Sequence, residues 1–406
     1  MIVNYNSLTN VSVTVFMITF AITSNVFFSI PLKAISLVVV FLLFVIGVII
    51  FKRIVRVTKK DIFCFILFSV FIVIWSVLGI ANGFNTSVLQ HALKITSFAL
   101  VVYLLYILIQ SGVVTVQKMY KNMWYVFVTA FIFKALLELS YISGMMSPND
   151  VKSFLLDNFQ MDTMLLGIAD GTMIRIGLIV DAFPLSIFPF LFINASRPQK
   201  LFIFLAVTFM TLINFSRIYI VQVTLMAIIL FSIELFKCNR KQRIALLFAL
   251  FGFILFSYVF SMYTGLWESL TDRFGDVADT SDYIRVEQTL VLSNSINDNI
   301  LIGKGIGAYI SSYVRSEQFP FLYEVEYLAL IYQVGLLGLI VLGCFFSVFI
   351  SKFPWKCINK QIKLLIITNL IFFFIRPSSN PMLFATSSAL ILICLYSCAT
   401  YHANNK

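Results

Sequence analysis

The sequence predicts an all-α polytopic membrane protein, built as a single transmembrane domain over residues 1–406. Hydrophobic residues make up 60% of the chain and charged residues only 12%, and the mean hydropathy is +0.98. A soluble domain of ordinary composition carries about 25% charged residues. Apolar runs of about 20 residues, long enough to cross a bilayer as a helix, recur along the whole length.

About twelve apolar segments are candidates for transmembrane helices. The fifth is followed by the helix breakers Gly144 and Pro148. The seventh and eighth are joined by a very tight turn at Ser216 and Arg217, and the eleventh is short and stops at Arg376. The expected spans are residues 10–30, 33–51, 61–81, 91–110, 122–143, 176–195, 201–216, 218–236, 244–263, 326–350, 364–376 and 382–400.

The basic residues predict the orientation of these spans. With twelve spans, the short loops that are rich in Lys and Arg all fall on the same side of the membrane, which identifies that side as cytoplasmic. Both termini are then cytoplasmic. The same loops account for most of the net charge of +11, so this charge does not indicate a nucleic acid partner. The loops are residues 52–60, 111–121, 196–200, 237–243 and 352–363.

Two larger loops, 144–175 and 264–325, face the opposite, periplasmic side. Both are acidic on balance, which makes their few arginines notable. The segment 149–167 has helical spacing of apolar residues, with Asp150 as its expected N-cap. We expect it to form a short amphipathic helix on the outer leaflet.

The 264–325 loop contains a second expected helix. Ser281 and Asp282 are its candidate caps, and Arg285 lies in its first turns. Alternating glycines follow at residues 303–307. They lack the Lys-Ser/Thr of a phosphate-binding loop, so a tight turn that lets the backbone approach a ligand or the next helix is the better interpretation.

The cysteines and histidines indicate neither disulfides nor a metal site. All six cysteines lie in spans or cytoplasmic loops. The only histidines are His91 and His402, which gives no Cys/His spacing of a metal centre. The N-terminus lacks the basic region of a cleaved signal peptide, so we expect the first span to be retained.

Charged residues inside spans are costly and require a partner or water. Lys134 and Glu138 are four residues apart on the fifth span, and we expect them to pair on one helix face. For Asp181, in the sixth span, two interpretations stay open. It either lines a polar cavity at the outer surface or sits as a charge at a helix end.

Four arginines, Arg175, Arg217, Arg285 and Arg376, are expected at outer junctions between water and membrane. A guanidinium group keeps its charge and presents a planar fork that suits phosphate oxygens. Several of them at headgroup depth would suit a lipid-linked diphosphate. The alternative is that each one anchors its helix at the interface.

Two carboxylates, Glu324 and Glu326, stand where the 264–325 loop re-enters the membrane. Partial desolvation makes a carboxylate a stronger base, and general base catalysis on a sugar hydroxyl needs such a group. We expect one of the two to be this base and the other to interact with the dipole of the following helix.

Several short motifs resemble the O-antigen polymerase (Wzy) and O-antigen ligase superfamily. One is the stretch from Glu324 to Gly335-Leu-Leu-Gly338, preceded by the glycines of 303–307. The others are the Ser216-Arg217 turn, an arginine (Arg285) upstream of the glycines, and Arg175-Ile-Gly177 before the sixth span. The arrangement of about twelve spans with a large outer loop before the tenth is similar too.

The resemblance implies a GT-C-like membrane glycosyltransferase of the bacterial inner membrane, independent of metals and of other cofactors. Its substrates would be undecaprenyl-diphosphate-linked oligosaccharide repeat units, joined on the periplasmic face within membrane lipid. Arg217 and Arg285 would hold the diphosphate, with Arg175 and Arg376 as secondary contacts, and Glu324 or Glu326 would act as the base. A chain-length regulator would be the expected protein partner.

Two alternatives stay open at this stage. Ligases of this superfamily carry a histidine eleven residues before the first glycine of the Gly-x-x-Gly pair, where this chain has Glu324, and this departure favours a polymerase. The other alternative is a flippase of lipid-linked oligosaccharides. The long 264–325 loop and the absence of a visible internal repeat argue against such a transporter.

Overall fold

A computed structural model describes most of the chain. The described residues are 2–22, 28, 30–50, 57–161, 167–168, 173–237, 239, 241–244, 268, 271, 280–297, 299–314, 316–317 and 319–404. The expected span 244–263 therefore lies outside the described residues, apart from Ile244.

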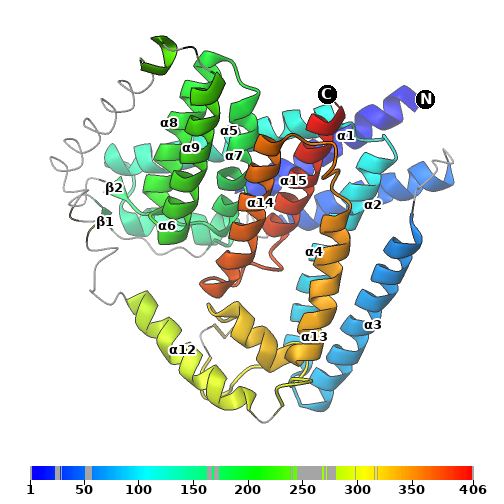
Figure 1. The fold of residues 1–406 in the computed structure, drawn as a ribbon. Coiled ribbons are helices and arrows are strands. Elements are labelled where there is room, and N and C mark those ends of the chain that lie inside the picture. The colour runs from blue at the N-terminus through cyan, green and yellow to red at the C-terminus, as the bar shows by residue number, and fades with distance from the viewer. Residues whose placement is uncertain are drawn as a thin grey trace.

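Helices dominate the described part of the chain (Figure 1). Its strands, β1 (Gly167–Ile168) and β2 (Met173–Ile174), form a two-residue antiparallel pair. The α-helices are α1 (Ile2–Ile22), α2 (Leu32–Ile49), α3 (Lys59–Ala81), α4 (Asn85–Gln110), α5 (Val116–Ile142), α6 (Pro148–Phe159), α7 (Pro184–Ile193), α8 (Arg197–Asn214), α9 (Arg217–Lys237), α12 (Thr280–Ile296), α13 (Glu326–Ser351), α14 (Lys360–Ile375) and α15 (Thr386–Asn404). Short 3-10 helices cover Ile179–Ala182 and Arg376–Ser378.

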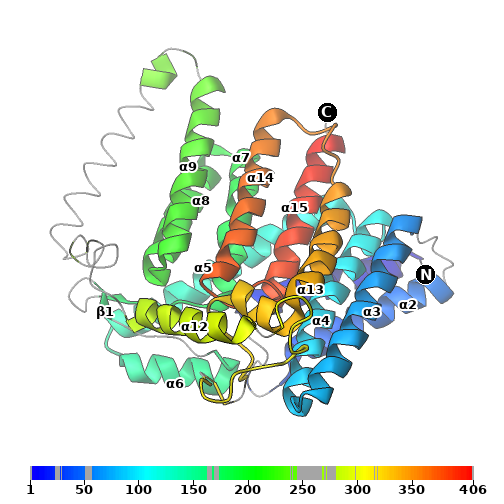
Figure 2. The same ribbon diagram turned by 60° about the horizontal axis from the view of Figure 1, so that its bottom comes forward.

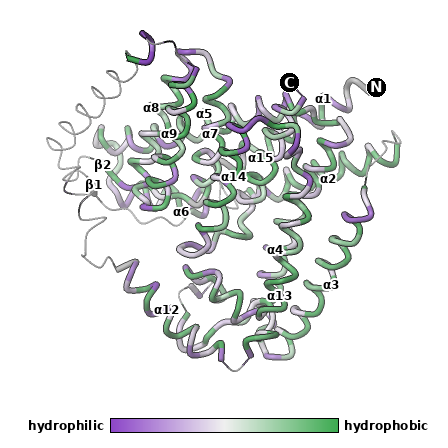
Figure 3. Tube along the Cα trace, viewed as in Figure 1, coloured by the Kyte–Doolittle hydropathy of each residue, from purple (hydrophilic) through white to green (hydrophobic). Residues whose placement is uncertain are grey.

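Seven of the described helices are long and apolar enough to cross a membrane, namely α2, α3, α4, α5, α9, α13 and α14. The tube in Figure 3 is hydrophobic along most of α2 and α3. Large apolar side chains on α3 face outward, and Phe63 and Phe65 are 65% and 64% exposed. Such a surface is compatible with lipid and not with water. The prediction of a multi-pass, helical membrane protein is confirmed.

Helix α15 occupies the centre of the bundle. It packs against α4, α5, α7 and α14, and its residues are buried continuously from Ser387 to Ala399. A helix that is buried on every face needs its polar groups satisfied locally. Ser397 does this by donating its hydroxyl to the carbonyl of Ile393 at 2.8 Å.

The described residues of the basic loops lie at the end of the bundle that carries the C-terminus (Figure 1). A continuous series of contacts between side chains next to these loops places them together. The contacts are Lys352 with Asp61, Lys352 over the ring of Tyr106, Gln110 with Tyr396, Tyr120 stacked on Tyr401, Asn194 with His402, and Lys200 with Glu234.

Helices α6 and α12 lie across the opposite end of the bundle (Figure 2). The amphipathic helix expected at 149–167 is α6, which ends at Phe159. The expected N-cap Asp150 is wrong, because Ser147 is the N-cap and Asp150 stands three residues later in a capping box. Its hydrogen bonds from Ser147 lower the pKa of Asp150. The helix expected in the 264–325 loop is α12.

Helix α13 is broken at Gly335, whose φ is +64°. In Figure 1 the part before the break lies across the bundle end, and the rest runs along the bundle. The break frees backbone groups that residues 300–305 satisfy. The amides of Lys304 and Gly305 donate to the carbonyls of Tyr332 and Gln333 at 2.9 and 2.7 Å, and those of Leu336 and Leu337 donate to Ile300 and Leu301 at 2.9 and 3.1 Å.

The glycines of 303–307 allow this segment to approach the neighbouring helices. Gly305 has φ of +100° and lies against the backbone of Gly79 in α3, and Gly307 lies against Ser87 in α4. The amide of Ile306 donates to the carbonyl of Trp75 at 2.9 Å. Of the two interpretations given above for these glycines, contact with the next helix is the one observed.

We predict that Gly305→Ala destabilises the protein by at least about 2 kcal/mol, because the new Cβ would collide with the α3 backbone and the residue would keep a left-handed φ. Gly343→Ala, in α13, is the control, since a Cβ there meets nothing within 4 Å. Thermal melting in detergent measures the difference. Equal melting temperatures for the two variants would contradict the prediction.

Candidate functional site

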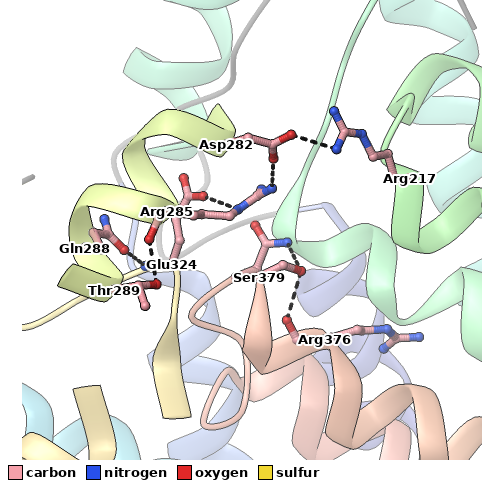
Figure 4. Close-up of polar contacts among 9 residues, drawn as sticks. Arg217, Asp282, Arg285, Gln288, Thr289, Glu324, Arg376 and Ser379 are labelled. Carbon is pink, nitrogen blue, oxygen red and sulfur yellow. Dashed lines mark hydrogen bonds and ion pairs between the residues drawn. The ribbon is translucent and has the colours of Figure 1, made fainter. Parts of the chain in front are cut away.

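Four charged side chains form a continuous series of ion pairs across the end of the bundle (Figure 4). Nη1 of Arg217, at the start of α9, lies 2.7 Å from Oδ2 of Asp282. Oδ1 of Asp282 lies 2.9 Å from Nη1 of Arg285, one turn later on α12. Nε of Arg285 lies 2.7 Å from Oε2 of Glu324, just before α13. We call these four residues the arginine–carboxylate chain.

The members of the arginine–carboxylate chain differ in solvent exposure, from partly exposed arginines to a nearly buried Glu324. The side chains of Arg217 and Arg285 are 33% and 26% exposed, whereas that of Glu324 is 8% exposed. A soluble anion or a lipid headgroup can therefore reach the guanidinium groups from outside. The carboxylate of Glu324 sits behind Arg285, where charge interactions are less weakened by water.

Helix α12 holds Glu324 in place through a second contact. The backbone amide of Glu324 donates to Oε1 of Gln288 at 2.7 Å, and Gln288 is fully buried. Beneath it, Leu292 and Ile296 pack in a hydrophobic cluster with Tyr323 and with residues of α13. The position of Glu324 relative to Arg285 is thus fixed by packing as well as by charge.

Glu326 has a different environment from Glu324. Its Oε2 accepts a hydrogen bond of 2.7 Å from the amide of Leu383, in the segment that precedes α15. It is buried and lies in the first turn of α13, where a negative charge interacts favourably with the helix dipole. Glu326 therefore binds the segment that precedes α15. Glu324 is the carboxylate that faces the arginines.

Arg175 lies close to the arginine–carboxylate chain. Its Nε donates to the carbonyl of Asn214 at 3.2 Å, next to the turn that leads to Arg217. Burial and the charge of Arg285 lower the pKa of Arg175. The predicted arginines Arg175, Arg217 and Arg285 are thus brought to the same end and within electrostatic reach.

A buried polar network surrounds the backbone of Arg175. Nζ of Lys134, from α5, pairs with Oδ2 of Asp181 at 2.7 Å and donates to the carbonyl of Ile176 at 2.8 Å. The amide of Leu178 at 2.9 Å and Nδ2 of Asn214 donate to the same oxygen of Asp181. These contacts tie the segment that carries Arg175 to α5 and to the end of α8.

The expected pairing of Lys134 with Glu138 is wrong. Lys134 pairs with Asp181 instead, and Oε1 of Glu138 accepts the amide of Ile174 at 3.0 Å. The extended segment 173–178 packs over α5 and brings the partners of both side chains close. Asp181, just after this segment, pairs with Lys134, and the amide of Ile174, within it, donates to Glu138. Of the two interpretations given above for Asp181, the charge at a helix end is the one observed, because Asp181 lies in the first turn of the 3-10 helix Ile179–Ala182 and accepts the amide of Leu178. It is also the centre of the buried network.

Arg376 is separated from the other arginines in its contacts. The residue is 2% exposed, and its Nη2 donates to Oγ of Ser186 at 2.7 Å and to Oε1 of Gln222 at 2.6 Å. It also lies 5.4 Å from the ring centre of Tyr219. In Figure 4 it points away from the arginine–carboxylate chain. The structure does not bring it together with Arg217 and Arg285.

The residue that sequence reasoning missed is Asp282. It was expected only to cap the helix, yet it links both arginines. The signal was present, because Asp282 and Arg285 are three apart and share a helix face. Among the described residues, no group of three or more His, Cys, Asp or Glu side chains could hold a metal ion.

Comparisons of the chain with protein-family models, with curated proteins and with solved structures find no match. Function is therefore inferred from the geometry and the chemistry of the site.

Proposed function

We propose that this chain is an O-antigen polymerase, a membrane glycosyltransferase that joins undecaprenyl-diphosphate-linked oligosaccharide repeat units at the periplasmic face of a bacterial inner membrane. The observation that carries the proposal is the arginine–carboxylate chain, in which Asp282 links two partly exposed guanidinium groups and one of them, that of Arg285, pairs with the shielded carboxylate of Glu324. Guanidinium forks suit a diphosphate, and a shielded carboxylate suits proton abstraction from a sugar hydroxyl.

The position of the site supports a periplasmic reaction. The described residues of the basic loops lie at the end of the bundle opposite to α12, and the excess of Lys and Arg in these loops assigns that end to the cytoplasm. The arginine–carboxylate chain then faces the periplasm, at the depth of the lipid headgroups. The proposal includes twelve spans in a GT-C-like arrangement, with a span at 244–263 between α9 and α12.

In the proposed mechanism, Arg217 and Arg285 bind the diphosphate of the donor lipid. Arg285 thereby exchanges Glu324 for phosphate oxygens, and Glu324 accepts the proton of an acceptor hydroxyl. That oxygen forms a bond to the anomeric carbon as the bond from this carbon to the phosphate oxygen breaks. The lipid diphosphate leaves with the electron pair, and the arginines stabilise its charge. Arg175 adds to the positive electrostatic potential at the diphosphate, while Arg376 stabilises the fold.

The broken helix α13 supports an enzyme over a transporter. Transporters use discontinuous helices to line a central site that opens alternately to each side. Here, backbone hydrogen bonds from residues 300–305 fill the break at Gly335, and packing against α3 and α4 holds them in place. A fixed site at one face of the membrane suits chemistry at that face.

The test is complementation of a strain that lacks this chain. We expect that strain to make lipopolysaccharide core with a single repeat unit, whereas bare core would indicate a ligase. Glu324→Gln is expected to reduce polymerisation about 100- to 10,000-fold at normal protein levels, because it removes the base. Glu326→Leu is the comparison and is expected to lower the amount of folded protein, because the backbone amide of Leu383 loses its acceptor. A full ladder with Glu324→Gln would refute the role of Glu324.

A further inference from the structure

One carboxylate bridges the two arginines of the site. Oδ2 of Asp282 contacts Arg217 and Oδ1 contacts Arg285, at 2.7 and 2.9 Å. The two oxygens of a single anionic group thus each bind one guanidinium. Two oxygens of a phosphate group would meet the same two donors in the same way.

We propose that Asp282 occupies the position of the ligand anion and acts as a specificity filter, so that a substrate must displace its carboxylate from Arg217 and Arg285 to bind. The inference rests on the proposed function, because it assigns the ligand of the same arginines. It adds a residue that selects which anions enter the site.

Displacement of Asp282 leaves the rest of the site in place. Helix α12 is held independently by the hydrogen bond of Gln288 to the backbone of Glu324 and by the packing of Leu292 and Ile296. Asp282 lies in the first turn of the helix and is 34% exposed. A rotation of its side chain into water therefore breaks the contacts of Asp282 with both guanidinium groups, while Arg285 keeps its ion pair with Glu324 until phosphate oxygens replace it.

The charge of Asp282 determines which ligands gain by replacing it. A lipid phosphodiester carries one negative charge and would only exchange one monoanion for another. A diphosphate carries more charge and more acceptor oxygens, so it gains Coulomb energy and hydrogen bonds over Asp282. In a membrane rich in phospholipid headgroups, Asp282 would keep the arginines available for the diphosphate-linked substrate.

The experiment measures binding of two probes to the purified protein in detergent by calorimetry: inorganic pyrophosphate and the monoanion dimethyl phosphate. Asp282→Asn is expected to bind dimethyl phosphate at least about tenfold more tightly than the unmodified protein, and to prefer pyrophosphate less strongly. Asp282→Ser is a second variant that also lacks the charge. Glu287→Gln is the matched control, because it makes the same change in charge on α12 and Glu287 forms no ion pair among the described residues.

Three outcomes are distinguishable. Tighter binding of dimethyl phosphate by both Asp282 variants, with Glu287→Gln unchanged, supports the filter. Unchanged or weaker binding by the Asp282 variants overturns it and leaves the proposed function standing, provided that pyrophosphate binding still depends on Arg217 and Arg285. If pyrophosphate does not bind, or binds equally well after Arg217→Ala and Arg285→Ala, the proposed function itself fails.

Discussion

Replacing Arg285 with alanine is expected to reduce polymerisation about 100- to 1000-fold, the usual effect of removing one group that stabilises transition-state charge. Arg285 is the only described residue that contacts both Asp282 and Glu324 through ion pairs. In the proposed mechanism its loss removes a contact to the leaving diphosphate, and it also removes the ion pair of 2.7 Å with Glu324. Elongation of lipid-linked repeat units by the purified protein measures the rate.

Two further variants sharpen this test. Arg285→Lys keeps the charge but lacks the planar fork, so its activity is expected to fall between those of the unmodified protein and Arg285→Ala. Lys152→Ala is the control, because Lys152 is an exposed cation on α6 at the same end of the bundle. A normal lipopolysaccharide ladder from Arg285→Ala, expressed at the level of Lys152→Ala, would remove Arg285 from the mechanism.

Asp181→Leu is expected to reduce the free energy of unfolding by about 3–5 kcal/mol, because it leaves the buried charge of Lys134 without its partner. The side chains of both residues are almost fully buried, at 2% and 4% exposure. The backbone of Leu178 and the amide of Asn214 lose an acceptor in the same step. Thermal melting in detergent measures the loss.

The double variant Lys134→Met/Asp181→Leu is expected to recover most of this stability, since it removes both charges together. Glu234→Gln is the control. It breaks the pair of Glu234 with Lys200 at the opposite end, whose side chains are 24% and 23% exposed, and ion pairs in contact with water contribute only about 0–1 kcal/mol. If Asp181→Leu and Glu234→Gln had the same melting temperature, the buried pair of Lys134 and Asp181 would stabilise the protein no more than the pair at the surface.

The sequence was sufficient for the membrane fold because the relevant information is local. An apolar run of membrane length forms a helix whatever its neighbours are. The same holds for the candidate residues Arg217, Arg285 and Glu324, since charges are rare in this chain and stand out at the ends of apolar runs. The ion pair of Arg285 with Glu324 follows from the packing of α12 against α13, and Arg217 joins the series from the start of α9 through Asp282.

Partner choice could not be predicted, because it depends on tertiary packing. Lys134 and Glu138 have suitable helical spacing, but Lys134 found Asp181, 47 residues away. Arg376 ends an apolar run and looked like an interfacial cation. The packing of α14 against α9 instead turns it inward toward Gln222. Spacing along one helix shows which contacts are available, and not which of them forms.

The interlock between residues 300–307 and α3 also constrains how the chain is made. The indole nitrogen of Trp75 donates to the carbonyl of Ile302 at 2.8 Å, across 227 residues of sequence. Helix α3 leaves the ribosome long before that partner exists. Helix α3 therefore enters the bilayer without its contacts to residues 300–307, and these contacts form only when the last third of the polypeptide has been synthesised. Assembly of this protein is therefore a late, largely post-insertional event, with the slow kinetics of distant contacts.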